Sequence, residues 1–105
     1  MIDVDKDTFA AEVLEGEGKI LVDFYGDGCV PCEAIMPFVM ECAQKYGGQL
    51  KFVKLNTSKA RRLSISQKIL GLPVIAIYHN GEKLEELVKD DATEANITAM
   101  IERHL

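Results

Sequence analysis

The chain has 105 residues, which is enough for one domain and too few for two. Apolar residues make up 48% of the chain and charged residues 28%, so a hydrophobic core can form without support from metals or disulfides. The net charge of −5 argues against partnership with nucleic acid or anionic membrane, because phosphate groups repel an acidic domain.

The first residues, MIDVDKDTF, lack the basic start and the apolar run of a secretory signal. No apolar stretch approaches the roughly 20 residues that cross a bilayer. We therefore expect a cytoplasmic protein, in a compartment where thiols stay reduced and structural disulfides are rare. Lys59, Arg61 and Arg62 form a local basic cluster, which we interpret as a solvated helix face because no aromatic residues interleave with it.

Strands and helices alternate along the chain, which predicts a single α/β domain over residues 1–105 with an open sheet. A short strand at 2–4 precedes a helix that Asp5 or Asp7 caps. KILVDFY at 19–25 is a near-continuous apolar run, typical of a strand that is covered on both faces. The later elements are expected as helix 32–46, strand 51–55, helix 58–70, a strand contained within 71–79, strand 83–89 and a last helix capped by Thr93.

Within these later elements, Asn80-Gly81 predicts a two-residue hairpin turn. In helix 58–70, Ile65 is expected to face inward together with Leu63 and Ile69.

The stretch GDGCVPC at 26–32 places two cysteines at the point where a strand ends and a helix begins. Such a pair clamps a metal, closes a loop or passes electrons. A helix N-terminus carries roughly +0.5 of a charge, which stabilises a thiolate and lowers its pKa. Positions i and i+3 of a helical turn bring two sulfurs within bonding distance. We therefore predict that Cys29 attacks a disulfide and that Cys32 resolves the mixed disulfide.

The alternative of a metal site has too few ligands. Structural zinc needs four ligands, usually as two close pairs, and the chain has no second C-x-x-C. His79 and His104 lie far apart in the sequence, and iron–sulfur ligation fails on the same count. The third cysteine, Cys42, falls on the apolar stripe of its helix and is predicted to be a buried structural thiol.

Asp23 interrupts an apolar strand, where a buried carboxylate without a partner is costly, so its pKa should be raised. We predict that it exchanges protons with Cys32, the alternative being an ordinary edge-facing aspartate. Lys54 on the next strand is its candidate charge partner. Pro73 in GLPV is either an ordinary proline at the start of a strand or a cis proline packed against the thiols.

Together these motifs resemble the thioredoxin family. VDFYGDGCVPC, Pro37, KLN at 54–56, GLPV and the NGE hairpin occur in the family's order and spacing over nearly the whole chain. The resemblance implies the thioredoxin fold, a mixed five-stranded sheet with three parallel strands, flanked by four helices. It also implies that Cys29 is the exposed nucleophile and that Cys32 is the buried resolving thiol.

By the same resemblance Asp23 is the buried carboxyl, Lys54 is its neighbour, and Pro73 is a cis proline that shapes the substrate groove. The substrate-binding positions that the resemblance implies are Gly28, Val30, Pro31, Leu72 and Pro73. The implied function is a protein-disulfide reductase and electron carrier whose redox group is a disulfide rather than a cofactor or a metal. Its expected partners are a flavoprotein thioredoxin reductase and disulfide-containing substrate proteins, and we expect a monomer.

The chain departs from the family's usual pattern beside the thiols. Gly28 stands where tryptophan is usual, Val30 where glycine is usual, and Glu33 where a basic residue is usual. The acids near the thiols should raise the pKa of Cys29, and the missing tryptophan removes an aromatic anchor from the docking surface. A glycine usual after the last strand is replaced within residues 89–91. These changes affect partner recognition more than chemistry.

GCVPC, together with NTSKARRLSISQKILGLP, resembles a narrower group, the thioredoxins of amino-acid-fermenting anaerobes that serve glycine, sarcosine and betaine reductases. This resemblance implies a selenoenzyme reductase complex as the recipient of electrons. Two other functions stay open at this point. One is an oxidant or isomerase on the same fold, which would differ in redox poise, and the other is a binding module with incidental thiols.

Overall fold

All 105 residues are described in a computed structural model of the chain. In chain order the elements are β1 (Ile2–Val4), the π-helix η1 (Ala10–Leu14), β2 (Lys19–Tyr25), α1 (Val30–Tyr46), β3 (Lys51–Asn56), the 3-10 helix η2 (Thr57–Lys59), α2 (Arg61–Ser66), β4 (Val74–His79), β5 (Glu82–Val88), the 3-10 helix η3 (Lys89–Asp91) and α3 (Glu94–Arg103). The strands form one sheet in the order β1-β3-β2-β4-β5. Strands β1, β3 and β2 run parallel, whereas β4 is antiparallel to both of its neighbours, so the predicted mixed five-stranded sheet is confirmed.

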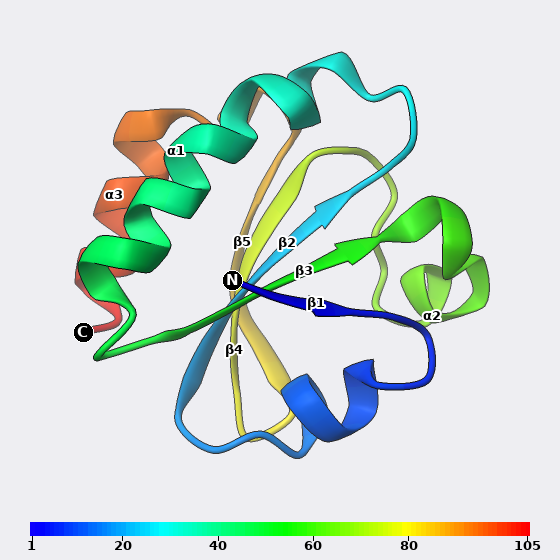
Figure 1. The fold of residues 1–105 in the computed structure, drawn as a ribbon, viewed down its shortest axis with the longest axis horizontal. Coiled ribbons are helices and arrows are strands. Elements are labelled where there is room, and N and C mark those ends of the chain that lie inside the picture. The colour runs from blue at the N-terminus through cyan, green and yellow to red at the C-terminus, as the bar shows by residue number, and fades with distance from the viewer.

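Helices cover both faces of the sheet. Helices α1 and α3 lie together against one face, and η1 and α2 lie against the other (Figure 1). Strand β2 is central, and its apolar side chains pack alternately into the two cores, Leu21 beneath α1 and α3, and Val22 and Phe24 on the opposite side. The near-continuous apolar run of β2 is therefore confirmed as a strand that is buried on both faces.

The first helix differs from its prediction in form. It is a five-residue π-helix rather than a regular amphipathic α-helix. Asp5, and not Asp7, supplies the cap of the preceding turn, because Asp5 Oδ1 accepts hydrogen bonds from the backbone N–H groups of Asp7 and Thr8 at 2.8 and 3.0 Å. These bonds to the Asp5 carboxylate hold its pKa below the ordinary value.

The predicted single helix over 58–70 is wrong. Ala60, at φ −145° and ψ 50°, separates the short helix η2 from α2, and Lys68, at φ 61°, lies just beyond the end of α2. Ser64 is the buried residue of α2, and its hydroxyl donates to the carbonyl of Ala60 at 2.7 Å. Ile65 consequently points outward with 61% of its surface exposed, so the prediction that it faces the core is also wrong.

Strand β4 begins at Val74, within the stretch 71–79 that was expected to contain it and one residue after Pro73. The residue before it, Pro73, has no N–H group to contribute to the sheet. At the other end of β4 the two-residue hairpin is confirmed, since Asn80 and Gly81 take φ values of 53° and 81° and His79 pairs with Glu82.

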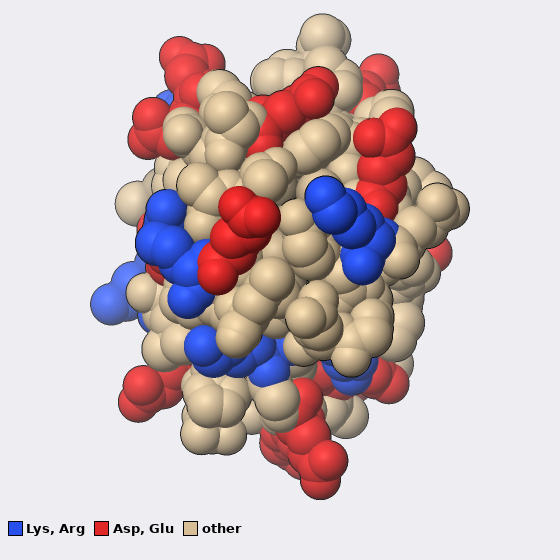
Figure 2. Space-filling model, turned by 90° about the vertical axis from the view of Figure 1, so that its left-hand side faces the viewer, with Lys and Arg blue, Asp and Glu red and all other residues tan.

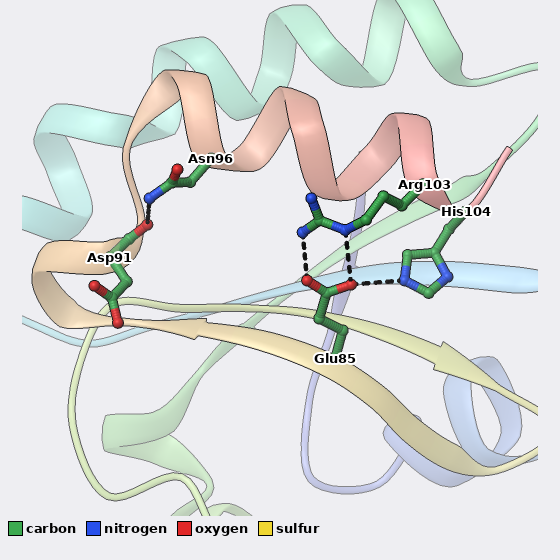
Figure 3. Close-up of polar contacts among 5 residues, drawn as sticks. All are labelled: Glu85, Asp91, Asn96, Arg103 and His104. Atoms are coloured by element: carbon green, nitrogen blue, oxygen red, sulfur yellow. Dashed lines mark hydrogen bonds and ion pairs between the residues drawn. The ribbon is translucent and has the colours of Figure 1, made fainter.

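The C-terminal helix is fastened to the edge strand β5 by polar contacts (Figure 3). The carboxylate of Glu85 on β5 contacts the Arg103 guanidinium and accepts from His104 Nε2 at 2.9 Å. At the other end of α3, the Asn96 amide donates to the backbone carbonyl of Asp91 at 2.9 Å. The bonds from Arg103 and His104 hold the pKa of Glu85 below its ordinary value. Thr93 caps the helix as predicted, accepting from the Asn96 backbone N–H.

Charge is spread rather than gathered on this side of the molecule. Acidic and basic side chains alternate over the face that α1 and α3 form, without a continuous field of one sign (Figure 2). None of the helices combines the length and the apolar character that a membrane-crossing helix needs.

Candidate active site

Cys29 and Cys32 form a disulfide across the first turn of α1, with their Cα atoms 5.3 Å apart. Cys29 is the N-cap of the helix, and its Sγ accepts a hydrogen bond from the backbone N–H of Cys32 at 3.3 Å. The two residues differ in access, since Cys29 is partly exposed whereas Cys32 is only 2% exposed. An incoming sulfur can therefore reach Cys29 far more readily than Cys32.

The loop before Cys29 is fixed by its backbone and by contacts to the loop that follows β3. Gly28 has φ 69°, in the left-handed region that favours glycine, so any other residue at this position would be strained. The Asp27 carboxylate accepts from Asn56 Nδ2 at 2.9 Å, and the Asp27 N–H donates to Ser58 Oγ at 2.9 Å. The turn at Gly28 is thus incompatible with an unstrained tryptophan, which explains this departure from the usual pattern.

Two hollows flank the disulfide. The first, here called the Cys32 hollow, has a volume of about 340 Å³ and is lined by Asp27, Cys32, Glu33, Lys54 and four neighbouring residues. The second, here called the Cys29 groove, has a volume of about 580 Å³ and is lined by Cys29, Thr57, Arg61, Ser64, Ile65, Ile69, Leu70, Gly71 and Leu72. Each sulfur of the pair therefore opens onto its own recess.

Asp23 is completely buried at the centre of the sheet, and neither of its carboxylate oxygens has a hydrogen-bond partner. It lies two residues before the end of β2, on the face that α1 covers. Burial raises the pKa of Asp23 to about 7, and the charge of Lys54 offsets only part of this rise. The carboxyl group is thus half-protonated near neutral pH, as burial within an apolar strand predicted.

Lys54 stands opposite Asp23 in the parallel register of β3 and β2, and on its other side stands Asp3 of β1. Its ammonium forms an ion pair with Asp3 Oδ1 at 3.5 Å, and no ion pair joins it to Asp23. Lys54, the predicted charge partner of Asp23, therefore lies beside Asp23 in the sheet but forms its ion pair with Asp3. Sequence reasoning missed Asp3, because nothing local indicates that β1 lies beside β3.

Comparison with known proteins decides the family. A sequence model described as Thioredoxin matches residues 1–103. The chain belongs to the thioredoxin family. It is 61% identical over 105 residues to a thioredoxin of Peptoclostridium acidaminophilum, covering all of this chain and 96% of that protein. It is 54% identical to a thioredoxin of Acetoanaerobium sticklandii over the full length of both, and 33% identical to thioredoxin 1 of a Nostoc species over 97% and 94% of the two chains.

Membership of the family assigns the fold and the class of reaction. The mixed five-stranded sheet with flanking helices is the thioredoxin fold. Thioredoxins are disulfide reductases that work through a redox-active disulfide rather than a bound cofactor, and the Cys29–Cys32 bond is such a disulfide. Members of the family exchange electrons with thioredoxin reductase and with disulfide-containing proteins.

The surroundings of the disulfide keep some of the expected thioredoxin features and change others. The peptide bond between Leu72 and Pro73 is cis, as the resemblance implied. Lys89, the first of the three residues among which the family's usual glycine is expected to be replaced, takes φ 54° and donates its backbone N–H to the Pro73 carbonyl at 2.8 Å. Val30 and Pro31 are exposed in the first turn of α1.

Three groove residues escaped the sequence analysis as site residues. The sequence predicts a solvated face for Arg61 and a core position for Ile65, and it predicts no site role for Leu70, yet all three residues line the Cys29 groove. Leu70 is 89% exposed, a feature that no hydrophobic periodicity reveals. By contrast Cys42 lies outside both hollows as a buried free thiol, as predicted, and burial raises its pKa.

We predict that Asp23 makes the stability of the oxidised protein depend on pH. Between about pH 4 and 7 the unfolded chain has lost the Asp23 proton while the folded protein keeps it, so the free energy of unfolding falls as pH rises. At about 1.4 kcal/mol per pKa unit, the rise from 3.8 to about 7 corresponds to a loss on the order of 4 kcal/mol. Urea unfolding of Asp23→Asn at pH 4 to 8 should lack this decline.

The matched control is Asp7→Asn, which changes an exposed acid that lines neither hollow and should follow the unchanged protein at every pH. Parallel curves for Asp23→Asn and the unchanged protein would show that the Asp23 carboxyl does not carry the raised pKa.

Proposed function

We propose that this thioredoxin is a single-domain, monomeric, cytoplasmic electron carrier in which Cys29 attacks substrate disulfides and Cys32 resolves them. The observation that carries this assignment is the unequal access of the two bonded cysteines at the start of α1. A partly exposed sulfur suits the attacking role, because it can approach a disulfide on another protein. A buried second sulfur suits the resolving role, because it reacts only within the complex.

Electrons and protons balance in two steps. In the reduced protein, the Cys29 thiolate attacks one sulfur of the substrate disulfide, and the other substrate sulfur leaves as a thiolate and takes up a proton. Cys32 then loses its proton and attacks the Cys29 sulfur, forming the Cys29–Cys32 bond and releasing the second substrate sulfur. Two electrons pass to the substrate, and a flavoprotein thioredoxin reductase returns them.

The start of α1 supports the nucleophile. The backbone N–H of Cys32 points at Cys29 Sγ, and this arrangement at a helix N-terminus stabilises a thiolate. Asp27 and Glu33, which line the Cys32 hollow, act in the opposite sense because two nearby negative charges disfavour a third. The helix terminus therefore favours the Cys29 thiolate, and the two acids disfavour it.

Asp23 is the proposed base for Cys32. A carboxyl group with a pKa of about 7 can take up and release a proton at neutral pH, whereas an ordinary aspartate stays ionised. Asp23 lies beneath α1 on the sheet face where Cys32 is buried. The role that we propose for Lys54 is to moderate the Asp23 pKa through its charge, from its place between Asp3 and Asp23.

We propose that the substrate chain lies along the Cys29 side of the disulfide. The positions proposed to receive it are Gly28, Val30, Pro31, Leu72 and Pro73. Leu72 lines the Cys29 groove itself, and Val30, 72% exposed, follows Cys29 directly. An extended apolar segment of a partner would cover these exposed side chains during attack.

We predict different failures for the two cysteine variants. Cys29→Ser should abolish the catalysed reduction of insulin by dithiothreitol, because no attacking sulfur remains. Cys32→Ser should attack but not resolve, so stable mixed disulfides should accumulate and appear on a non-reducing gel. Cys42→Ser is the control, since a buried thiol outside both hollows takes no part in exchange. Stable mixed disulfides in Cys29→Ser rather than in Cys32→Ser would reverse the assigned roles.

We predict that Asp23 shapes the pH dependence of exchange. With Asp23→Asn no base serves Cys32, so the second step should slow by about tenfold or more at pH 6 to 7 and recover at higher pH, where hydroxide removes the thiol proton. The measurement is single-turnover oxidation by a peptide disulfide from pH 5 to 9, with Asp7→Asn as the control. An unchanged profile would remove Asp23 from the mechanism.

The proposed recipient of the electrons is a selenoenzyme complex of the glycine, sarcosine or betaine reductase type. The support is the GCVPC motif and the similarity to thioredoxins from two amino-acid-fermenting anaerobes. With its own thioredoxin reductase and NADPH as the sole electron source, the protein should sustain consumption of glycine, sarcosine or betaine by the purified complex. Cys29→Ser should not. Active insulin reduction without support of any such complex would disprove this partner.

A further inference from the structure

The rim of the Cys29 groove is unusually apolar for an exposed surface. Ile65 and Leu70 line the groove with 61% and 89% of their surfaces exposed, and Leu72 lines it from the loop before β4. Val30 is exposed directly after Cys29. Exposed apolar side chains gathered around a reactive sulfur are suited to contact with an apolar partner segment.

Lys89 lies against this groove in a conformation that favours glycine. Its φ of 54° is uncommon for a lysine, and its backbone N–H is bound to the Pro73 carbonyl. Its aliphatic stem crosses the backbone of Gly71, a residue that lines the groove. A Cβ atom on Gly71 would come within 2.3 Å of Lys89 Cε and within 3.2 Å of Cγ and Cδ. The absence of a side chain on Gly71 thus makes room for the lysine.

Backbone strain that persists beside a reactive group points to function. A glycine at position 89 would relieve the strain but would carry no charge. The lysine places an ammonium group at the end of a stem that lies along the groove's backbone wall. This arrangement keeps a cation beside Gly71, a residue that lines the groove.

Arg61 supplies a second cation from α2, where it lines the same groove. The five ion pairs of the structure use other cations, so neither Arg61 nor Lys89 is neutralised by a carboxylate of this chain. The acids Asp27 and Glu33 line the Cys32 hollow instead. Although the chain has a net charge of −5, the recess beside Cys29 is therefore lined by the unpaired Arg61, with Lys89 packed against its wall at Gly71, and the recess beside Cys32 is lined by acids.

We infer that Arg61 and Lys89 make this thioredoxin selective for disulfides that are flanked by an acidic residue within an apolar segment. The apolar rim would hold the segment and the two cations would hold its carboxylate, placing the attacked sulfur at Cys29. The inference rests on the proposed role of Cys29 as the nucleophile. It concerns which disulfides react fastest and leaves the exchange chemistry unchanged.

The test compares three disulfide peptides that differ only in the residue beside the attacked cysteine, which is Glu, Gln or Lys, with leucine next to it. At about 20 mM salt, kcat/KM should be roughly fivefold higher for Glu than for Gln, as expected of one or two exposed ion pairs, and lowest for Lys. The preference should shrink toward one at 1 M salt, because salt screens exposed charges.

Variants assign the preference to residues. Lys89→Asn keeps a residue that tolerates positive φ and removes the charge, so the Glu-to-Gln ratio should fall several-fold, and Lys89→Glu should reverse it. Arg61→Gln should lower the ratio from the other side of the groove. The matched control is Lys68→Asn, because Lys68 is also an exposed lysine at positive φ, but the side chain that packs against Gly71 in the groove wall is that of Lys89. This variant should keep the ratio of the unchanged protein.

The outcomes separate this inference from the proposed function. If the unchanged protein reduces none of the three peptides, the proposed function fails. If it reduces all three at equal rates, or if the preference survives in both Lys89→Asn and Arg61→Gln, the selectivity inference is overturned while the reductase function stands.

Discussion

An ionisable group without a hydrogen-bond partner lies at the centre of the sheet, and the proposed mechanism depends on it. Asp23 lies on the middle strand, so the helices on that face and the strands on both sides remove it from water. A fold selected only for stability would place an apolar side chain there, because burying a carboxylate is costly. The thioredoxin fold accommodates this cost, and the same burial brings the pKa of the carboxyl to about 7, where proton transfer is useful.

The start of α1 places the two cysteines beside that central strand in different environments. Cys29, as the N-cap, meets solvent, while Cys32, one turn further, is buried above the sheet. In the proposed mechanism, deprotonation of the buried thiol therefore depends on the interior of the fold, and recognition depends on the surface beside Cys29. The acids and the cations are divided in the same way, with Asp27 and Glu33 around one recess and Arg61 beside the other.

The sequence predicts those features of the fold that arise from local patterns. Three such features are confirmed, and each depends on only a few neighbouring residues. They are the apolar run of β2, the i and i+3 spacing of the cysteines, and the Asn80-Gly81 turn. The ion pair between Lys54 and Asp3 depends instead on which strands become neighbours. Ile65 was misplaced for a related reason, since the backbone breaks on either side of α2 change the direction in which an apolar residue points.

Asp23 and Lys89 each violate a local rule, and we propose a role in proton transfer for the first and in recognition for the second. One is a carboxyl group inside an apolar strand, and the other is a lysine in a backbone conformation that favours glycine. Proteins retain such violations mainly where function compensates for the lost stability. The buried carboxyl fits proton transfer within the fold, and the strained lysine fits recognition outside it. This division is consistent with a carrier that keeps its family's chemistry while changing the disulfides it prefers.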